Sequence, residues 1–409
     1  MLHLRSLQFN ACDCFVALGC LYFLQDVLYP PGVINQAIQL LMILWAFIES
    51  VKYIINFKHT PRLLNIVSLL VAMYTLYGVL YMLYVAEVHI TEAGSRNVGT
   101  YLYLQNALNS LLPFYLLYSF ACQNKLTAKR LRIYCIVFLT LFVVMYFKSY
   151  KMALLQAAVK GIERKEFTNN TGYNFVMLIP FLFFFKQKLF RYIMLIIIMV
   201  MTIMCMKRGA ILIGGICFVW FLWADFRYSD RLAHKITTLL LATCVVFSAI
   251  VYIDYKQETS SYFRSRIEQT LKGDASGRNE IYPKIWNAVK NDESVIHLLV
   301  GRGANATVNV AGNYAHQDWL ELACNNGLLG VLLALLFYIT IFFTAYLHRN
   351  NLRKEYYTAF LMVGFMLFSK TLFSMSIANM KIWEIMPIAF LLWNVTNQDI
   401  EETEQIVEL

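Results

Sequence analysis

A histidine stands where a polar loop becomes a long apolar segment, in GNYAHQDWLELACNNGLLG, residues 312–330. Asp318 and Glu321, which follow His316, have the spacing of a helix N-cap and its capping-box partner, and the sequence favours that role for both. The positive end of the helix dipole disfavours imidazolium, so the ring would stay neutral and able to accept a proton from a hydroxyl group. We therefore interpret His316 as a candidate general base and keep Asp318 as a candidate substrate contact.

Cationic side chains suited to phosphate oxygens occur at three further places. Lys207 and Arg208 lie in MKRGA between two apolar runs, where a pair of charges is costly and suggests a function. Arg278 follows a Ser-Gly turn and precedes an amphipathic helical pattern, and Arg302 lies between two glycines that permit close backbone approach to a ligand. The planar guanidinium group offers several donors to phosphate, so each arginine is a candidate for binding a phosphorylated substrate.

Other polar residues lie near the ends of apolar runs. Asn170 belongs to FTNNTGYNF, whose amides, hydroxyls and aromatic rings suit either sugar recognition or helix caps and turns. Lys370 lies within an apolar run, and Lys381 and Glu384 could form an i, i+3 pair. No Asp-x-Asp pair occurs, and the outer loops lack a convincing carboxylate cluster for a divalent metal. Cationic side chains would then carry the charge of a departing diphosphate, so we expect neither a metal nor another cofactor.

The elements that must position these residues are apolar helices. The chain has 409 residues, of which 59% are hydrophobic and 15% charged, and its mean hydropathy of +0.55 places it among integral membrane proteins. A membrane-spanning helix needs about 20 mostly apolar residues. About twelve runs fit, at 12–28, 33–56, 63–86, 101–121, 132–147, 173–185, 190–206, 209–224, 236–253, 318–347, 356–377 and 382–396. We predict an all-α polytopic membrane protein of one integral membrane domain, residues 1–409, with about twelve transmembrane helices.

Basic residues in the short loops predict the orientation. If the N-terminus is cytoplasmic and has no cleavable signal, every inside turn is basic, and an even number of spans returns the acidic tail 397–409 to the cytoplasm. The long loop 254–317, before the tenth helix, then lies outside. Its charges fit either a solvated loop or an external surface that collects an anionic ligand. Among the seven histidines, only His89, His297 and His316 would face outward.

In this order, the motifs resemble those of the bacterial O-antigen polymerase and ligase superfamily of membrane glycosyltransferases. Lys-Arg-Gly at 207–209 is followed by Ser-Gly-Arg at 276–278, Gly-x-Gly at 301–303 and AHQDWLELACNNGLLG entering a helix. Gln317 replaces the asparagine that usually follows the histidine, an amide for an amide. The resemblance covers about residues 205–335 at the level of motifs, and the helical layout extends it loosely over the chain.

The resemblance implies a GT-C-like helical fold in the bacterial inner (plasma) membrane, with the active site facing outside and loop 254–317 as a periplasmic catalytic loop. It implies a metal-independent, inverting glycosyltransferase that uses undecaprenyl-diphosphate-linked glycans. Arg208 and Arg278 match the arginines held to contact the diphosphate, and His316 matches the histidine held to activate the acceptor. The remaining candidates for substrate binding are Lys207, Arg302, Asp318, Lys370, Lys381 and Asn170.

Our leading interpretation is a polymerase of oligosaccharide repeat units for a surface polysaccharide, such as O-antigen, capsule or exopolysaccharide. The alternative is a ligase that transfers the finished glycan to the lipid A core. A lipid-oligosaccharide flippase fits less well, because it predicts midplane charges and internal repeats that the sequence does not clearly contain. The expected partners are the lipid-linked donor and acceptor, membrane lipids, a chain-length regulator and a flippase, and no nucleic acid.

Overall fold

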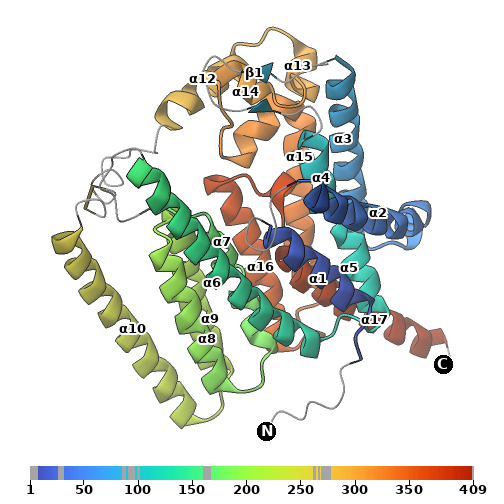
Figure 1. The fold of residues 1–409 in the computed structure, drawn as a ribbon. Coiled ribbons are helices and arrows are strands. Elements are labelled where there is room, and N and C mark those ends of the chain that lie inside the picture. The colour runs from blue at the N-terminus through green and yellow to red at the C-terminus, as the bar shows by residue number, and fades with distance from the viewer. Residues whose placement is uncertain are drawn as a thin grey trace.

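Long apolar helices lie side by side and form most of the molecule (Figure 1). The computed structural model describes residues 8–25, 32–84, 89–90, 97–98, 102–159, 167–260, 264–265, 268 and 278–407. Within these ranges the only strands are the two-residue β1 (His89–Ile90) and β2 (Asn97–Val98), which pair antiparallel. The predicted all-helical class is confirmed.

Six helices are long and apolar enough to cross a membrane, which makes this a membrane-embedded protein. They are α2 (Val33–Ile55), α3 (Arg62–Tyr84), α6 (Ala128–Val159), α9 (Arg208–Tyr228), α15 (Asp318–Leu347) and α16 (Lys354–Phe373). Other apolar runs form α1 (Ala11–Phe23), α8 (Lys188–Met204), α10 (Leu232–Thr259) and α17 (Ile382–Val407). A total of twelve spans stays a prediction, because several of these helices are short or carry charges.

Two predicted spans are interrupted near prolines. The fourth run forms α4 (Leu102–Leu111) and α5 (Pro113–Cys122), and the sixth forms α7 (Thr171–Val176) and the 3₁₀ helix η2 (Ile179–Phe184), which contains Pro180. Proline has no backbone N–H to donate and its ring crowds the preceding turn, so a helix ends or changes type there. The sixth run therefore places a short helix, α7, at one end of the bundle.

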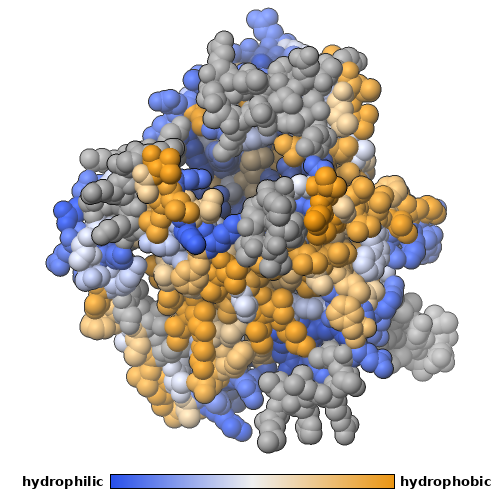
Figure 2. All heavy atoms as spheres, viewed as in Figure 1, coloured by the Kyte–Doolittle hydropathy of each residue, from blue (hydrophilic) through white to orange (hydrophobic). Residues whose placement is uncertain are grey.

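The main core lies between the long helices and is rich in aromatic rings. Trp383, at the start of α17, is fully buried, and its ring centroid lies 4.5 Å from that of Phe23 and 4.7 Å from that of Phe142. These contacts join α17 to α1 and α6. Apolar side chains also cover the flank of the molecule between two more hydrophilic ends (Figure 2). Such a belt is the surface that a lipid environment favours.

Residues 278–311, within the predicted loop 254–317, form a helical layer at the end of the bundle, uppermost in Figure 1. The first residues of this loop extend α10 to Thr259, and α12 (Arg278–Lys290), α13 (Val295–Val300) and α14 (Ala306–Ala311) follow. Ile285, Ala306, Ala315 and Cys324 form a small core between this layer and the first turns of α15. The acidic tail, in its described part, continues α17 to Val407.

Two glycines attach this layer to α15. Gly327 interrupts α15 with a φ of 60°, and a Cβ atom there would lie 2.4 Å from the backbone nitrogen of Gly301. A Cβ atom on Gly301 would lie 2.4 Å from the carbonyl oxygen of Asn325, and the N–H of Arg302 donates to the carbonyl of Cys324 at 2.9 Å. The prediction that the Gly-x-Gly motif lets a ligand approach is wrong at Gly301, because α15 occupies that space.

Candidate functional site

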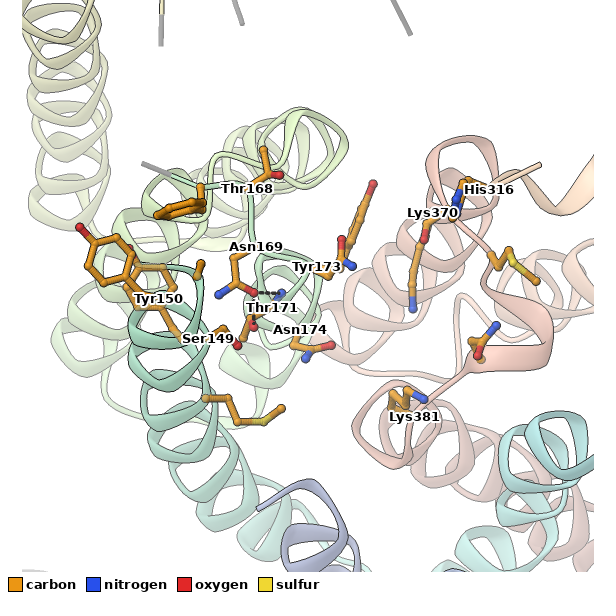
Figure 3. A pocket seen from close by; sticks show the side chains of 18 residues that line it. Ser149, Tyr150, Thr168, Asn169, Thr171, Tyr173, Asn174, His316, Lys370 and Lys381 are labelled. Atoms are coloured by element: carbon orange, nitrogen blue, oxygen red, sulfur yellow. Dashed lines mark hydrogen bonds between the residues drawn. The ribbon is translucent and has the colours of Figure 1, made fainter. Parts of the chain in front are cut away.

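A cavity of about 590 Å³ lies at the end of the bundle that adjoins the helical layer (Figure 3). It is lined by the last part of α6, by α7 and the segment 167–170 before it, by His316 ahead of α15, and by the end of α16 and its connection to α17. His316, Asn170, Lys370 and Lys381 all contribute to the lining. The fold thus brings together four of the residues that the sequence suggested as site candidates.

The two sides of this cavity differ in chemistry. His316, Lys370 and Lys381 lie on one side in Figure 3, whereas Ser149 and Tyr150 of α6 lie on the other, with the residues around α7 between and behind them. Ser149 and Tyr150 were missed in the sequence because the fifth run was ended at 147, although α6 continues to Val159. A continuous helical pattern through that segment is the signal that could have found them.

The amide-rich segment before α7 has a defined conformation. The side-chain oxygen of Asn169 accepts hydrogen bonds from the backbone N–H of Thr171 at 3.0 Å and from its hydroxyl group at 2.7 Å. Its backbone N–H donates to the carbonyl of Cys205 at 2.8 Å. The neighbouring Asn170 and Asn174 also line the cavity. This side of the cavity therefore offers amide side chains at a turn that hydrogen bonds hold in place.

His316 has a left-handed backbone conformation, with a φ of 55°, and its neighbour is anchored by a buried carboxylate. Glu321, which is 4% exposed, accepts a hydrogen bond from the N–H of Ala315 at 2.6 Å. The other carboxylate oxygen accepts from the hydroxyl of Thr307 at 2.5 Å and from the amide of Asn325 at 3.2 Å. Glu321 therefore fixes the chain immediately before His316 to the helical layer and to α15.

Asp318 connects α15 to the segment that follows α16. Its carboxylate accepts hydrogen bonds from the N–H groups of Ser376 at 2.8 Å and Ile377 at 3.0 Å, and the residue is 5% exposed. The N-cap of α15 is Gln317, whose side chain makes no capping bond. The predicted capping box of Asp318 and Glu321 is therefore wrong. One oxygen of the Asp318 carboxylate is thus held by backbone N–H groups, so Asp318 positions the segment that follows α16. Asp318 is not among the residues that line the cavity, and its substrate contact stays a prediction.

Lys370 and Lys381 meet at the carboxylate of Glu384. The ammonium of Lys370 donates to this carboxylate at 2.6 Å, and both side chains are buried. The second oxygen accepts from the backbone N–H of Lys381 at 3.0 Å. The predicted side-chain pair of Lys381 and Glu384 is thus replaced by a backbone contact, and Glu384 pairs instead with Lys370. Only the packing of α17 against α16 makes that partner available.

The ammonium of Lys381 lies 5.7 Å from the centre of the Phe23 ring. Burial lowers the pKa of Lys381 to about 8, repulsion by Lys370 acts in the same direction, and Glu384 opposes both. Lys381 is therefore mostly charged at neutral pH and loses its proton more readily than an ordinary lysine.

Two of the candidate arginines, Arg208 and Arg278, lie near Phe373, the last residue of α16. Arg278 donates to the carbonyl of Phe373 at 3.0 Å. Arg208 begins α9, and a Cβ atom on the next residue, Gly209, would lie 2.8 Å from Cβ of Phe373. Ser374, which follows, lines the cavity, whereas Lys207, Arg208 and Arg278 are not among its lining residues. His316 thus shares the cavity with lysines, whereas Arg278 contacts Phe373 and the chain next to Arg208 packs against the same residue.

Arg302 lies away from the cavity and stabilises the helical layer. Its guanidinium group contacts the carboxylate of Asp292 at 2.7 Å and donates to the carbonyl of Ala288 at 2.8 Å. Asp292 also contacts the ring of His297 at 2.9 Å. The pKa of Asp292 is lowered by the N–H of Ser294, then by His297 and Arg302. The structure shows this structural role for Arg302, and its substrate contact stays a prediction.

In the part of the chain that the structure describes, no group of three or more His, Cys, Asp or Glu side chains is placed to hold a metal ion. Neither a known protein family nor a curated protein matches this chain. The function must therefore be argued from the site itself.

Proposed function

We propose that this protein is a membrane glycosyltransferase that polymerises undecaprenyl-diphosphate-linked oligosaccharide repeat units into a surface polysaccharide. The observation that carries the proposal is that one cavity, at one end of an apolar helical bundle, holds a histidine, two lysines and several amides. A transferase with a lipid-diphosphate donor needs these three kinds of group: a base for the acceptor, cations for the leaving group and polar groups for the sugars. The order of motifs that resembles the O-antigen polymerase and ligase superfamily supports the same conclusion.

In the proposed reaction, the imidazole of His316 accepts the proton of an acceptor hydroxyl group. The acceptor oxygen forms a bond to the anomeric carbon of the donor glycan, and the bond from that carbon to the diphosphate oxygen breaks. The electron pair of the broken bond leaves with undecaprenyl diphosphate, and attack from the opposite face inverts the anomeric centre. A base in the cavity activates the acceptor hydroxyl group, and a cation in the same cavity stabilises the departing diphosphate, so both lower the barrier to transfer.

The departing diphosphate would lie between Lys381 and the cavity end next to Phe373. Lys370 supplies less net charge than Lys381, because its ammonium is paired with Glu384. Arg278 gives one N–H group to the carbonyl of Phe373 and another to the hydroxyl of Tyr282, and a guanidinium group has five donors, so others remain for phosphate. The helix that begins at Arg208 packs against Phe373 at Gly209, which supports a second arginine contact there.

The opposite side of the cavity would bind the glycan. Asn169, Asn170 and Asn174 offer amide donors and acceptors, and Tyr150 adds an aromatic face on which a sugar ring can pack. The cavity volume of about 590 Å³ lies in the usual range for ligand sites, roughly 300–1,000 Å³. A donor glycan in this position would have its diphosphate directed towards Lys381.

The positions of the basic turns support an outward-facing site in the bacterial inner membrane. α6 begins at Ala128, within the basic stretch 125–132, and α16 begins directly after the basic turn 349–353. Residues towards the other ends of both helices line the cavity. Basic turns favour the cytoplasmic side, so the cavity would face outside, and the chain ends would be cytoplasmic. Nucleotide sugars are absent there, and a donor must therefore arrive attached to a membrane lipid.

Deletion of the gene in the source organism, followed by gel analysis of surface glycans, tests the proposal. We expect the long ladder to disappear and a single repeat unit to remain. Wild type should restore the ladder, whereas His316→Ala should not, even when the variant is present in the membrane. His297→Ala is the matched control, because this histidine lies in the helical layer beside Asp292 and not at the cavity.

Restoration of the ladder by His316→Ala would contradict the proposed mechanism. Loss of every repeat unit from the lipid A core, with accumulation of lipid-linked polymer, would instead identify the ligase of the same superfamily.

A further inference from the structure

A second cavity, of about 410 Å³, lies at the opposite end of the bundle from His316. It is lined by the starts of α6, α8 and α16, by the end of α9 and by the connection between η2 and α8. Its charged lining residues are Arg132, Lys186, Lys188, Arg191, Arg353, Asp225 and Glu355. The five cations exceed the two carboxylates, so the cavity has an excess of positive charge.

One of the two carboxylates is already engaged with the protein. Asp225 is 5% exposed and lies 3.5 Å from the ammonium of Lys188 and 3.5 Å from the guanidinium group of Arg191. It also accepts a hydrogen bond from the hydroxyl of Tyr192. Arg191 is held further by its bond to the carbonyl of Phe185 at 2.6 Å. These contacts form a fixed inner wall, whereas Lys186 and Arg353 are exposed at the rim.

Helix N-termini add to the positive potential of this cavity. α8 begins at Lys188 and α16 at Lys354, and neither Gln187 nor Arg353, the respective N-cap residues, makes a side-chain capping bond. The first N–H groups of a helix have no partner within the helix, and the helix dipole favours an anion near them. The first turns of α8 and α16 and the basic residues at the rim therefore face the same cavity.

The surroundings of the cavity are apolar. Phe183, Phe184 and Phe185 line it and are at most 7% exposed. The next residues of α8 expose Leu189 and Ile193 on the flank of the bundle. A ligand with an anionic head and apolar chains matches this combination, since its head can reach the cations while its chains remain along the helices.

We propose that this cavity binds the phosphate group of an anionic phospholipid. The shared chemistry is a phosphate oxygen that contacts Lys186, Arg353 and the helix starts, and free phosphate could supply the same group. The site lies at the end of the bundle that carries the basic turns, where anionic lipid attracts Lys and Arg side chains. The proposal does not depend on glycosyl transfer.

The test compares the wild type with the double variant Lys186→Gln/Arg353→Gln. Both side chains are exposed, so the replacements should not disturb the fold. The matched control is Arg227→Gln/Lys235→Gln, which removes two charges near the same end. Arg227 lies over the ring of Trp223 at 5.1 Å, much as Arg353 lies over Tyr356 at 5.0 Å, but neither control residue lines the cavity.

The purified proteins would be placed in nanodiscs of phosphatidylcholine with or without phosphatidylglycerol. Native mass spectrometry after release measures the phosphatidylglycerol that each protein retains, and calorimetry with sodium phosphate measures binding of the free anion. We expect the wild type and the control to retain phosphatidylglycerol over phosphatidylcholine. The cavity variant should bind it roughly tenfold or more weakly, because two cations near the head group are lost.

The outcomes separate the sources of the phosphate. If the wild type and the control retain phosphatidylglycerol and the cavity variant does not, the lipid is the ligand. Binding of sodium phosphate alone, lost in the cavity variant, supports the anion site with a soluble ligand. Equal losses in the cavity variant and the control, or no binding of either ligand to the wild type, would overturn the proposal.

Discussion

Replacement of Glu321 by glutamine tests whether the carboxylate beneath His316 holds the site in place. One carboxylate oxygen accepts from the N–H of Ala315, and the other accepts from the hydroxyl of Thr307 and the amide of Asn325. A carboxylate only accepts hydrogen bonds, whereas glutamine has one accepting oxygen and one NH₂ group that donates. The variant has the same shape but must direct a donor towards groups that are themselves donors.

The surrounding bonds prevent a simple adjustment. If the glutamine oxygen keeps the N–H of Ala315, its NH₂ group faces Thr307 and Asn325. The Thr307 hydroxyl can rotate to accept, but Asn325 cannot turn its oxygen towards the glutamine without losing the N–H of Thr307, which it accepts at 3.1 Å. The lost hydrogen bonds and one unsatisfied buried donor cost about 2–4 kcal/mol together.

Hydrogen–deuterium exchange at the amide of Ala315 measures this cost directly. A local loss of 2 kcal/mol corresponds to roughly 30-fold faster exchange, so Glu321→Gln should reach at least that value. Thermal unfolding in detergent should shift downward as well. Glu280→Gln is the matched control, because Glu280 is exposed on α12. If Glu321→Gln has the same exchange rate at Ala315 and the same thermal midpoint as Glu280→Gln, the role assigned to this carboxylate is refuted.

Three further predictions concern the cavity and the helices that form it. Burial and Lys370 lower the pKa of Lys381 to about 8, so its ammonium loses a proton as the pH rises through 8. Pyrophosphate binding, measured between pH 6.5 and 9, should therefore weaken over this range in the wild type. It should not weaken in Lys381→Arg, because arginine stays charged. Glu384→Gln leaves the buried ammonium of Lys370 without its counter-charge and should lower the free energy of chemical unfolding by about 3 kcal/mol. The double variant Glu384→Gln/Lys370→Met should recover part of this free energy, because the unpaired charge is gone. Gly327→Ala forces a Cβ atom to within 2.4 Å of a backbone nitrogen at a φ of 60° and should lower the thermal midpoint, whereas Gly215→Ala, where a Cβ atom meets nothing within 4 Å, should not.

The sequence determined the class of the protein and the position of most helices. The predicted run 318–347 coincides with α15, and the run 33–56 differs from α2 by one residue. Backbone N–H and C=O groups find no partner in lipid, so an apolar segment long enough to span must satisfy them within its own helix. That constraint is local, and the composition of each segment therefore suffices to locate it.

Polar residues at the ends of apolar runs were also visible in the sequence. Asn170, His316, Lys370 and Lys381 each stood out for this reason, and all four line one cavity. Their polarity marked them as candidates, because a polar group near a lipid environment is costly without a role. Nothing in their spacing, however, indicated that they would meet.

The partner of each buried charge was decided only by the tertiary structure. The spacing of Asp318 and Glu321 fits a capping box, yet Asp318 binds backbone N–H groups up to 59 residues away, and Glu384 pairs with Lys370 from another helix. A sequence pattern specifies which local contacts are available, whereas a buried carboxylate takes the set of donors that the packed helices bring to it. Because removal from water makes an unsatisfied charge so costly, the donors available after packing outweigh the local ones.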